Sequence, residues 1–553
     1  MRSVLGKKWI INNEDLLLPI FERITKNRPH QSLKDIPLHD SGLLPGIEKA
    51  LKRIQKAIDN KERIIIFGDY DVDGITGTAI LFDILKRLNA KVSFRLPNRM
   101  EDGYGLSTKF LRDFKENRIN LLITVDCGIS CAKEVEKFAH NKIDTIITDH
   151  HTIPENLPEK AVSIVHPKLP NSNYPFKELT GAGVALKLAQ ALIKKHLPDE
   201  EKALTDHYIQ LAALGTVADM GPLLDENRAI VKQGLQNLKA TSWYGLKELL
   251  RNSKIDRNNE LTSQTIGFRL APRINAAGRI GDPYKALFLL LQGKDSPKLK
   301  QLGTELENLN LERQRMTYQA IFQAQDVLDK YQQLPNIIVL EHPDWHVGIL
   351  GLIAGRLVEK YSRPVLIMQD QGDSLTGSAR SLNNINITSI LTSVSENLES
   401  FGGHSGAAGF SLKKSQLPKF KKAIEKVANK QIKASELTPI LEIDCTVNMK
   451  EMTDELITQL NELKPFGIQN QKPKFMLKNI SPNFISQVGR EKRHLKFSAY
   501  KDDKNIDVIG FNLGEHISSI KTYKSIDLVF ELEKNYFNGR EKLQFKALDF
   551  RQT

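Results

Sequence analysis

The chain has 553 residues, which at about 100–200 residues per domain predicts roughly three to five domains. With 40% hydrophobic and 26% charged residues, its composition is that of an ordinary globular protein. The formal net charge of +13 favours a polyanionic partner, although the excess is spread over a large chain. The three cysteines, Cys127, Cys131 and Cys445, are too few for a disulfide framework or a four-thiolate zinc site.

The first twenty residues are not expected to form a signal peptide, because they contain no apolar run followed by a small-residue cleavage site. No stretch approaches the roughly 18 uncharged apolar residues that a membrane span needs. We therefore expect a soluble protein with no membrane partner, located in a reducing cytoplasm.

Residues 1–60 are expected to form mixed short helices, including an amphipathic helix over 46–60. Short β-branched runs then alternate with helical segments, which predicts βαβ units and a mostly parallel sheet within residues 61–294. The expected strands are 63–67, 91–96, 121–125, 143–148 and 161–165, and the helices between them are 75–88, 107–116 and 132–141. From 180 to 290 the pattern is largely helical.

Residues 295–335 carry leucines at 299, 302, 306 and 309, a spacing that predicts a long connecting helix; a helical hairpin is the alternative. A second, smaller α/β pattern covers residues 336–433. Residues 434–553 contain many short alternating segments with turn signals such as Phe537-Asn538-Gly539-Arg540, which predicts a small β-barrel.

Carboxylates and histidines gather where three predicted strands end. Residues 68–74 (GDYDVDG) follow the first strand, Asp126 follows the third, and residues 149–151 (DHH) follow the fourth. Ligands of open parallel sheets bind outside the carboxyl ends of the strands, so these side chains should share one crevice. Asp219, in a later segment, is a further candidate.

So many carboxylates repel one another unless cations neutralise them. Oxygen ligands with one or two imidazoles suit Mg²⁺ or Mn²⁺, and two such ions about 3.5–4 Å apart can activate water and stabilise a phosphoryl transition state. We expect Asp126 to bridge two ions and His151 to face the substrate phosphate. Asp69 and Asp71 would serve one ion. The other ion would be held by Asp73, His150 and Asp219.

Six segments carry a family resemblance. They resemble the four ordered motifs of the DHH phosphoesterase superfamily, the glycine-rich signature of its DHHA1 partner domain and a further motif of its RecJ branch. The segments are residues 69–74 (DYDVDG), 125–128 (VDCG), 148–151 (TDHH), 218–220 (ADM), 401–409 (FGGHSGAAG) and 272–280 (PRINAAGRI).

The resemblance covers nearly the whole chain and implies an α/β multidomain protein. Its parts would be an N-terminal segment (1–60), a DHH domain (61–294), a connecting helix (295–335), a DHHA1 domain (336–433) and a C-terminal OB-fold barrel (434–553). It implies a single-strand-specific 5′→3′ DNA exonuclease of recombination and mismatch repair, using two Mn²⁺ or Mg²⁺ ions. Single-strand binding protein and a RecQ-type helicase would be its partners.

One position departs from the superfamily pattern. Many members carry a metal-ligating His four residues before the second Asp of the first motif, where this chain has Phe67. Asp69 is expected to substitute, as in other RecJ-like sequences.

The resemblance also implies substrate-binding residues. Ser378 and Arg380 would form a pocket for the 5′-terminal phosphate with Arg99, since a guanidinium suits a terminal phosphate. His404 would bond the scissile phosphate. Gly402 and Gly403 would let backbone approach a phosphate, assisted by N–H groups at the start of a following helix. Arg273, Asn275 and Arg279 are candidates for contacts to the DNA backbone, with Arg279 also sensing the sugar.

Tyr104, Trp345 and His346 are candidates for stacking bases, with packing as the equal alternative. A basic cluster at residues 490–496 is either a DNA-binding face or a solvated loop. Two other functions are considered: a nano-RNase or oligonucleotide phosphodiesterase of the same superfamily, and a non-catalytic DNA-binding scaffold. The chain length argues against the first, and the complete set of acidic and histidine residues argues against the second.

Overall fold

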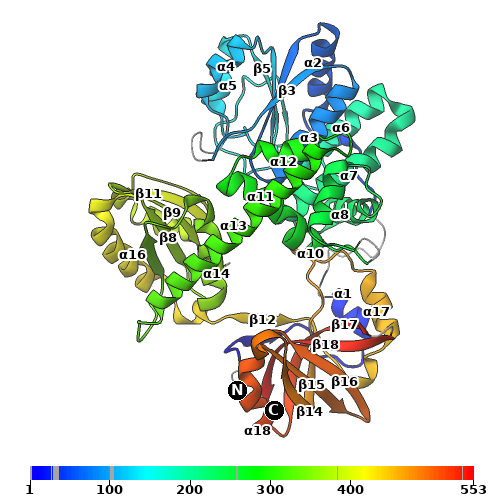
Figure 1. Cartoon of the computed structure of the whole chain (residues 1–553), viewed down its shortest axis with the longest axis vertical. Helices are drawn as coiled ribbons and strands as arrows, with labels where there is room; N and C mark the ends of the chain where they lie inside the picture. The colour runs from blue at the N-terminus through cyan, green and yellow to red at the C-terminus, as the bar shows by residue number, and fades with distance from the viewer. Residues whose placement is uncertain are drawn as a thin grey trace. The chain divides into compact units, whose positions relative to one another are not determined.

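The computed structural model describes residues 3–26, 28, 36–99, 105–256, 259–382, 384–537 and 540–553. The chain divides into two compact units (Figure 1). The central unit comprises Ser32–Gln314 and Pro465–Gln471. The terminal unit comprises Met1–Gln31, Arg315–Lys464 and Lys472–Thr553, so it contains both ends of the chain. Residues 1–60 are thus divided between the two units.

The central unit is built on a five-stranded sheet in the order β3-β2-β4-β5-β6. All four strand pairings are parallel, as the alternation of short β-branched runs and helices predicts. The strands are β2 (Arg63–Gly68), β3 (Lys91–Arg95), β4 (Leu121–Val125), β5 (Asp144–Thr148) and β6 (Ser163–Val165).

Helices cover both faces of this sheet. Ile64 and Ile66 of β2 belong to one hydrophobic cluster with α2 (Ile47–Asp59) and α3 (Val72–Arg87). The alternate residues Ile65 and Phe67 belong to another, with phenylalanines from α4 (Leu111–Glu116) and α5 (Ala132–His140). Because both faces are buried, the strands carry continuous apolar runs rather than an alternating pattern.

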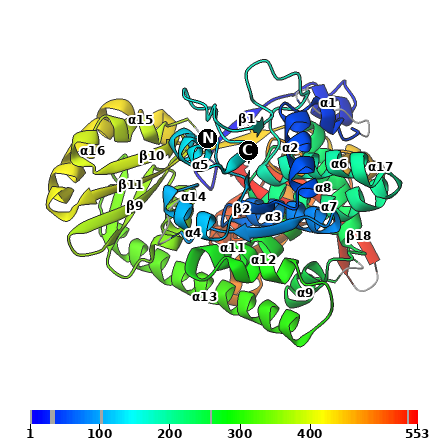
Figure 2. The ribbon, with the colours of Figure 1, turned by 90° about the horizontal axis from the view of Figure 1, so that it is seen from above.

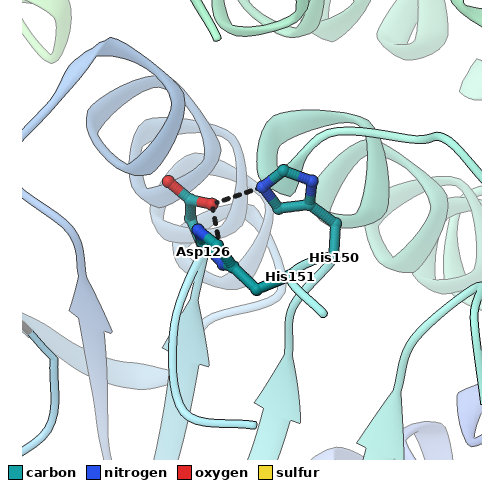
Figure 3. A group of neighbouring side chains, drawn as sticks. All are labelled: Asp126, His150 and His151. Atoms are coloured by element: carbon teal, nitrogen blue, oxygen red, sulfur yellow. Dashed lines mark ion pairs between the residues drawn. The ribbon is translucent and has the colours of Figure 1, made fainter. Parts of the chain in front are cut away.

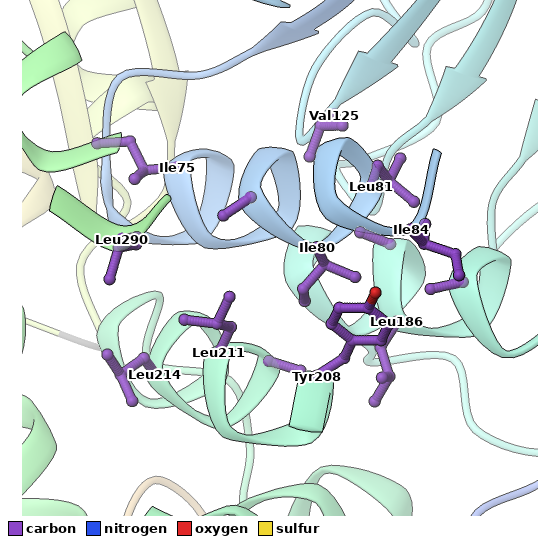
Figure 4. Packing of buried hydrophobic residues seen from close by; sticks show 14 of the residues in the cluster. Ile75, Ile80, Leu81, Ile84, Val125, Leu186, Tyr208, Leu211, Leu214 and Leu290 are labelled. Carbon is purple, nitrogen blue, oxygen red and sulfur yellow. The ribbon is translucent and has the colours of Figure 1, made fainter. Parts of the chain in front are cut away.

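Further helices pack against α3, and the buried side chains between α3 and these helices form a core (Figure 4). Ile80 and Ile84 of α3 lie near Leu186 of α6 (Gly181–His196) and Tyr208 of α7 (Glu201–Ala218). The remaining elements are α8 (Asp225–Leu238), α9 (Tyr244–Asn252), α10 (Ser263–Thr265), the π-helical turn η4 (Ile266–Leu270), α11 (Ala271–Ile280) and α12 (Tyr284–Leu290).

The predicted connecting helix is confirmed as α13 (Pro297–Leu328), a single helix of 32 residues rather than a hairpin. Figure 2 shows it along its length. It begins in the central unit and ends in the terminal unit.

The terminal unit contains a second sheet in the order β10-β11-β9-β8-β7. Its strands are β7 (Ile338–His342), β8 (Val365–Asp370), β9 (Ser374–Arg380), β10 (Ser400–His404) and β11 (Ala407–Lys413). The helices of this region are α14 (Leu350–Tyr361), α15 (Ile387–Thr392) and α16 (Leu417–Gln431). Phe420 and Ile424 of α16 and Phe410 of β11 belong to the core that covers the sheet, which gives a small α/β fold.

The C-terminal residues form the predicted small barrel. Five strands pair in the order β14-β15-β16-β18-β17, and the pairing of β17 with β14 closes the ring. They are β14 (Phe475–Val488), β15 (His494–Lys501), β16 (Lys504–Gly510), β17 (Ile526–Phe537) and β18 (Arg540–Gln552). The expected turn residues Asn538 and Gly539 lie outside the described residues. Two helices accompany the barrel, α17 (Asp454–Asn461) and α18 (Ile517–Thr522).

The start of the chain joins this barrel region. The strand β1 (Lys8–Ile11) pairs in parallel with β12 (Ile440–Ile443), and Val4 N–H donates to Phe550 C=O at 2.9 Å. The short strand β13 (Cys445–Thr446) pairs with β14, and α1 (Ile20–Lys26) follows β1 along the chain. Among the described residues, no helix combines the length and apolar character that crossing a bilayer requires.

A buried ion pair ties the start of the central unit to its helices. The Lys187 and Glu226 side chains are fully buried and paired, and both also bond to the backbone of His39. We expect Glu226→Ala to lower the free energy of unfolding by about 3–5 kcal/mol, because it leaves a buried ammonium without its counter-charge. Urea denaturation of the metal-free protein measures the change.

The control is Lys194→Ala, which removes an exposed ion pair with Asp40. Solvent screens exposed pairs strongly, so this variant should unfold close to the wild-type midpoint. Equal effects of the two substitutions would contradict the structural role assigned to the buried pair.

Candidate metal centre

The strand register of the central sheet gathers the predicted acidic and imidazole residues at one edge. Gly68, Val125 and Thr148 are aligned neighbours at the ends of β2, β4 and β5. Asp69, Asp126 and Asp149 each follow one of these strand ends. The parallel arrangement therefore delivers three segments that are distant in sequence to the same crevice, as expected.

Two backbone features orient the carboxylates. Asp71 caps α3, and its side chain accepts hydrogen bonds from the N–H groups of Asp73 at 2.9 Å and Gly74 at 3.1 Å. Asp126 adopts a left-handed conformation with φ of 61°, which aspartate tolerates better than most residues. This conformation turns its side chain at the strand end toward the histidines (Figure 3).

His150 lies at the centre of the cluster. Its Nε2 lies 3.1 Å from Asp126 Oδ1, 3.6 Å from Asp219 Oδ2 and 3.9 Å from Asp73 Oδ2. His151 Nδ1 lies 3.9 Å from Asp126 Oδ1. Three overlapping groups have potential ligand atoms within 4.8 Å of one another: Asp126, His150 and His151; Asp73, His150 and Asp219; and Asp69, Asp71 and Asp126.

The donor atoms of this cluster fit divalent cations. Asp126 Oδ1 and His150 Nε2 are buried, and within the described part of the chain neither forms a hydrogen bond. Leaving such atoms unsatisfied costs about 1–3 kcal/mol each, whereas coordination to a cation satisfies both. Oxygen donors with one or two imidazoles match the preferences of Mg²⁺ and Mn²⁺. Asp126 and His150 each belong to two of the three groups. That Asp126 bridges two ions stays a prediction.

Without bound cations, the carboxylates of this cluster repel one another. Burial, together with the neighbouring charge of Asp71, raises the pKa of Asp69 and raises that of Asp73 to about 7. Burial and the surrounding aspartates likewise raise the pKa of Asp126, and they raise that of Asp219 to about 8. Divalent cations at this position would offset the repulsion.

Asp149 has a role different from that of the other aspartates. Its side chain accepts hydrogen bonds from the N–H groups of His150, His151 and Ile129 at 2.7, 3.2 and 2.9 Å, and it lies 2.7 Å from His151 Nδ1. Although burial opposes the charge, these bonds and His151 hold the pKa of Asp149 well below its usual range. Asp149 was expected in the crevice but was not assigned a catalytic or metal-binding role, although its position beside two histidines was a usable signal.

The imidazole of His151 is fixed by this contact. Although partial burial opposes protonation, the bond to Asp149 and nearby carboxylates raises the pKa of His151 to about 9. Burial and the proximity of His151 instead lower the pKa of His150 to about 3. The two adjacent histidines therefore differ in protonation: the imidazole of His150 is neutral, whereas that of His151 carries a proton.

Phe67, which occupies the position of a histidine ligand in many members of the superfamily, belongs to the hydrophobic core. Phe67 is fully buried and packs against Phe110 with ring centroids 5.2 Å apart, so it lies in the core below the sheet edge. Asp69 is instead grouped with Asp71 and Asp126 at the edge itself. That Asp69 takes over the ligand role stays a prediction.

The segment 272–280 forms α11 and supports the first motif. Asn275 Oδ1 accepts a hydrogen bond from Val72 N–H at 3.3 Å, and Gly278 lies so close to Tyr70 that a Cβ atom would come within 2.5 Å of its carbonyl oxygen. Arg273 is held by Glu307, with 2.5 Å from Nε to Oε2 and 3.1 Å from Nη2 to Oε1. These contacts assign Asn275 and Arg273 packing roles, and their DNA contacts stay predictions.

The guanidinium of Arg99 lies over the ring of Tyr70, 5.5 Å from its centroid. Burial, the charge of Asp69 and the other neighbours raise the pKa of Tyr70 to about 12. Arg279 is a further cation that acts on this phenol. Both arginines therefore lie beside the first motif, and their contacts with DNA stay predictions.

The candidates in the terminal unit lie on three adjacent strands. Ser378 and Arg380 share one side of β9, with 3.1 Å from Arg380 Nη1 to Ser378 Oγ. Strand β11 pairs Gly409 with Ser378 on one side and with Gly402 of β10 on the other. The serine, the arginine and the glycine-rich segment therefore lie on neighbouring strands of one sheet.

One expectation for this segment was wrong. Residues 401–409 form a β-hairpin in which the glycines lead into strand β11 rather than into a helix, so helix N–H groups are not what they offer to a phosphate. Gly403 has φ of 147° and lies against Ala407 and Ala408, where a Cβ atom would collide with the neighbouring strand. His404 is exposed at the end of β10 and pairs with Ala407.

Two of the three candidates for base stacking form contacts within the protein. Trp345 is buried, stacks on His342 and donates to Gln323 Oε1 at 2.9 Å, so its role is packing. His346 accepts a hydrogen bond from Gly348 N–H at 3.0 Å and thereby caps a helical turn. Tyr104 lies outside the described residues.

Models of three protein families match the chain in the order of its folds. The DHH family N-terminal domain matches residues 63–216, the DHHA1 domain matches 334–430, and the RecJ OB domain matches 443–549. A parallel sheet with Asp-His-His at its edge, followed by a DHHA1 domain, defines a DHH–DHHA1 protein.

Similar proteins agree with this assignment. The single-stranded-DNA-specific exonuclease RecJ of Haemophilus influenzae is 32% identical over 98% of both chains. The RecJ of Bacillus subtilis is 37% identical over 93% of this chain, which spans 64% of that relative's length. A crystal structure of RecJ with Mn²⁺ from Thermus thermophilus superimposes with a TM-score of 0.82 at 30% identity, covering 99% of this chain and 80% of that one. The chain belongs to the RecJ family.

The raised pKa values predict that metal binding releases protons. Because Asp73 and Asp219 have pKa values of about 7 and 8 in the metal-free protein, protons and divalent ions compete for them near neutral pH. The affinity for Mn²⁺ should therefore rise from about pH 6 to about pH 9, while the number of protons released falls. Calorimetric titration in two buffers of different ionisation enthalpy measures both. An affinity independent of pH over this range would contradict the expected competition.

Proposed function

We propose that this protein is a metal-dependent, single-stranded-DNA-specific 5′→3′ exonuclease that releases 5′-mononucleotides and acts in recombination and repair. The observation that carries the proposal is the convergence of buried carboxylates on His150, where unsatisfied donor atoms suit two divalent ions. Membership of the RecJ family supports the substrate class. We further propose a cytoplasmic location, and single-strand binding protein and a RecQ-type helicase as partners.

The residues of the centre would have different roles in phosphodiester hydrolysis. Asp69, Asp71, Asp73, Asp126, His150 and Asp219 would hold Mn²⁺ or Mg²⁺. When bound, such ions lower the pKa of water and neutralise the charge that develops on the phosphate. His151, oriented by Asp149, presents its protonated imidazole to the phosphate or to the leaving oxygen.

The polarity of digestion requires recognition of the 5′ end. We propose that Ser378 and Arg380 bind the 5′-terminal phosphate, because the hydroxyl and the guanidinium lie side by side on β9. Gly402, Gly403 and His404 would complete the contacts of this sheet to the phosphates. In the central unit, Arg99 would bind a phosphate and Arg279 would bind near the sugar.

The decisive experiment for the reaction class follows 5′-labelled and 3′-labelled single strands with and without Mn²⁺. We expect mononucleotides to leave from the 5′ end only when the metal is present. A duplex of the same sequence and a short oligoribonucleotide serve as comparison substrates. Faster digestion of the oligoribonucleotide, or release from the 3′ end, would contradict the proposal.

Asp126 provides the sharpest test of the centre. Asp126→Asn and Asp126→Ala should lower the exonuclease rate by at least about a thousandfold, which is about 4 kcal/mol, while single-strand affinity falls less than about threefold. Asparagine tolerates the left-handed backbone of this position, so Asp126→Asn separates loss of the ligand from backbone strain. Asp199→Ala, at an exposed position, is the control. Substantial activity in Asp126→Asn would remove this residue from the centre.

Arg380 tests the 5′-phosphate pocket. Arg380→Ala should slow digestion of a 5′-phosphorylated strand by about tenfold to a hundredfold, because a charge-assisted bond contributes about 1.5–3 kcal/mol. A strand with a 5′-hydroxyl should be affected little. Arg356→Ala, at an exposed arginine of α14, is the matched control. An equal loss on both substrates would argue against end recognition by this residue.

A further inference from the structure

The metal centre rests against the first turn of α6, which lies outside all of the acidic motifs. The Asp73 side chain is 1% exposed, and both of its oxygens accept hydrogen bonds from this turn. Gly181 N–H donates to Oδ2 at 2.6 Å and Ala182 N–H donates to Oδ1 at 3.0 Å. These amides come from the start of a helix of 16 residues, where the N–H groups need acceptors and the helix dipole favours negative charge.

The two hydrogen bonds from α6 fix the orientation of the Asp73 carboxylate. A carboxylate oxygen has two lone-pair directions, and a hydrogen bond from a backbone N–H group occupies one of them on each oxygen. The Thr180 side chain at the N-cap of α6 is a further hydrogen-bond partner of this carboxylate. Asp73 Oδ2 also lies 3.9 Å from His150 Nε2, so the carboxylate faces the cluster. The backbone of α6 thus selects the side-chain position in which Asp73 serves the cluster.

Glycine is required at two positions around this contact. A Cβ atom at Gly181 would lie 2.5 Å from Asp126 Cβ and 2.6 Å from Asp126 Oδ1. A Cβ atom at Gly215 of α7 would lie 2.4 Å from Asp73 Oδ1 and 2.5 Å from Ala182 Cβ. Real Cβ atoms do not approach their neighbours so closely, so a methyl group at either position must displace a carboxylate.

We propose that Gly181 and Gly215 are positioning residues of the metal centre. Gly181 sets the place of Asp126 and, through its amide, that of Asp73. Gly215 leaves the space that the Asp73 carboxylate occupies. This inference rests on the proposed metal centre and extends it to residues that touch neither metal nor substrate.

The test is calorimetric titration of Mn²⁺ into metal-free Gly181→Ala and Gly215→Ala, together with thermal melting followed by circular dichroism. We expect both variants to fold. Gly215→Ala should lose at least tenfold in affinity for one of two ions, because only Asp73 is displaced. Gly181→Ala should weaken the binding of both ions, because Asp126 would be a ligand of both. The KM for single-stranded DNA should stay within twofold of the wild-type value while kcat falls.

The matched control is Gly267→Ala in the π-helical turn η4. There a Cβ atom would meet Val217 Cγ1 at 3.6 Å, an ordinary contact, so two ions should bind with wild-type affinity. Wild-type binding of two ions by folded Gly215→Ala and Gly181→Ala would overturn the inference while leaving the proposed function intact. Failure of both variants to fold would also overturn it, because the glycines would then serve packing. Failure of the wild-type protein to bind Mn²⁺ would instead overturn the proposed centre itself.

Discussion

Electrostatic repulsion among buried carboxylates is the constraint on which the central unit depends. Asp69, Asp73 and Asp126 are at most 4% exposed, and their pKa values are raised by burial and by neighbouring aspartates, Asp71 among them. A protein without cations would gain stability by removing such a cluster. Its presence in a well-packed fold is understandable if divalent ions supply the missing charge and satisfy the buried donor atoms.

The surrounding structure holds these groups together against their repulsion. The parallel sheet aligns three strand ends, and the hydrophobic clusters on both of its faces prevent the strands from shifting. Backbone amides of α3 and α6 bind the side chains of Asp71 and Asp73. Asp149 orients the two histidines from behind. Helix starts and main-chain N–H groups thus act as a second layer around the proposed ligands, and this layer orients them before any ion binds.

Much of the fold and of the acidic cluster at the sheet edge could be predicted from sequence because their signals are local. Short β-branched runs with helices between them identify the parallel sheet, and a carboxylate after each strand end identifies its functional edge. The leucine spacing from 299 to 309 favours the single long helix that is found.

What could not be predicted depends on contacts between distant residues. The pairing of β1 with β12 joins segments more than 400 residues apart, and the contact of Asp73 with Gly181 spans 108 positions. The hairpin at residues 401–409 could not be predicted because glycines and alanines carry no alternating pattern. Likewise, the salt bridge from Arg273 to Glu307 is invisible until α11 and α13 are placed.

The central claim is that segments from β2, β4, β5 and α7 hold a pair of divalent ions around Asp126. Anomalous diffraction from a crystal of the protein grown with Mn²⁺ tests it most directly. The account predicts two strong peaks flanking the Asp126 carboxylate, each also in contact with residues among Asp69, Asp71, Asp73, His150 and Asp219. The absence of both peaks from this edge of the sheet, at a Mn²⁺ concentration that supports nuclease activity, would contradict it.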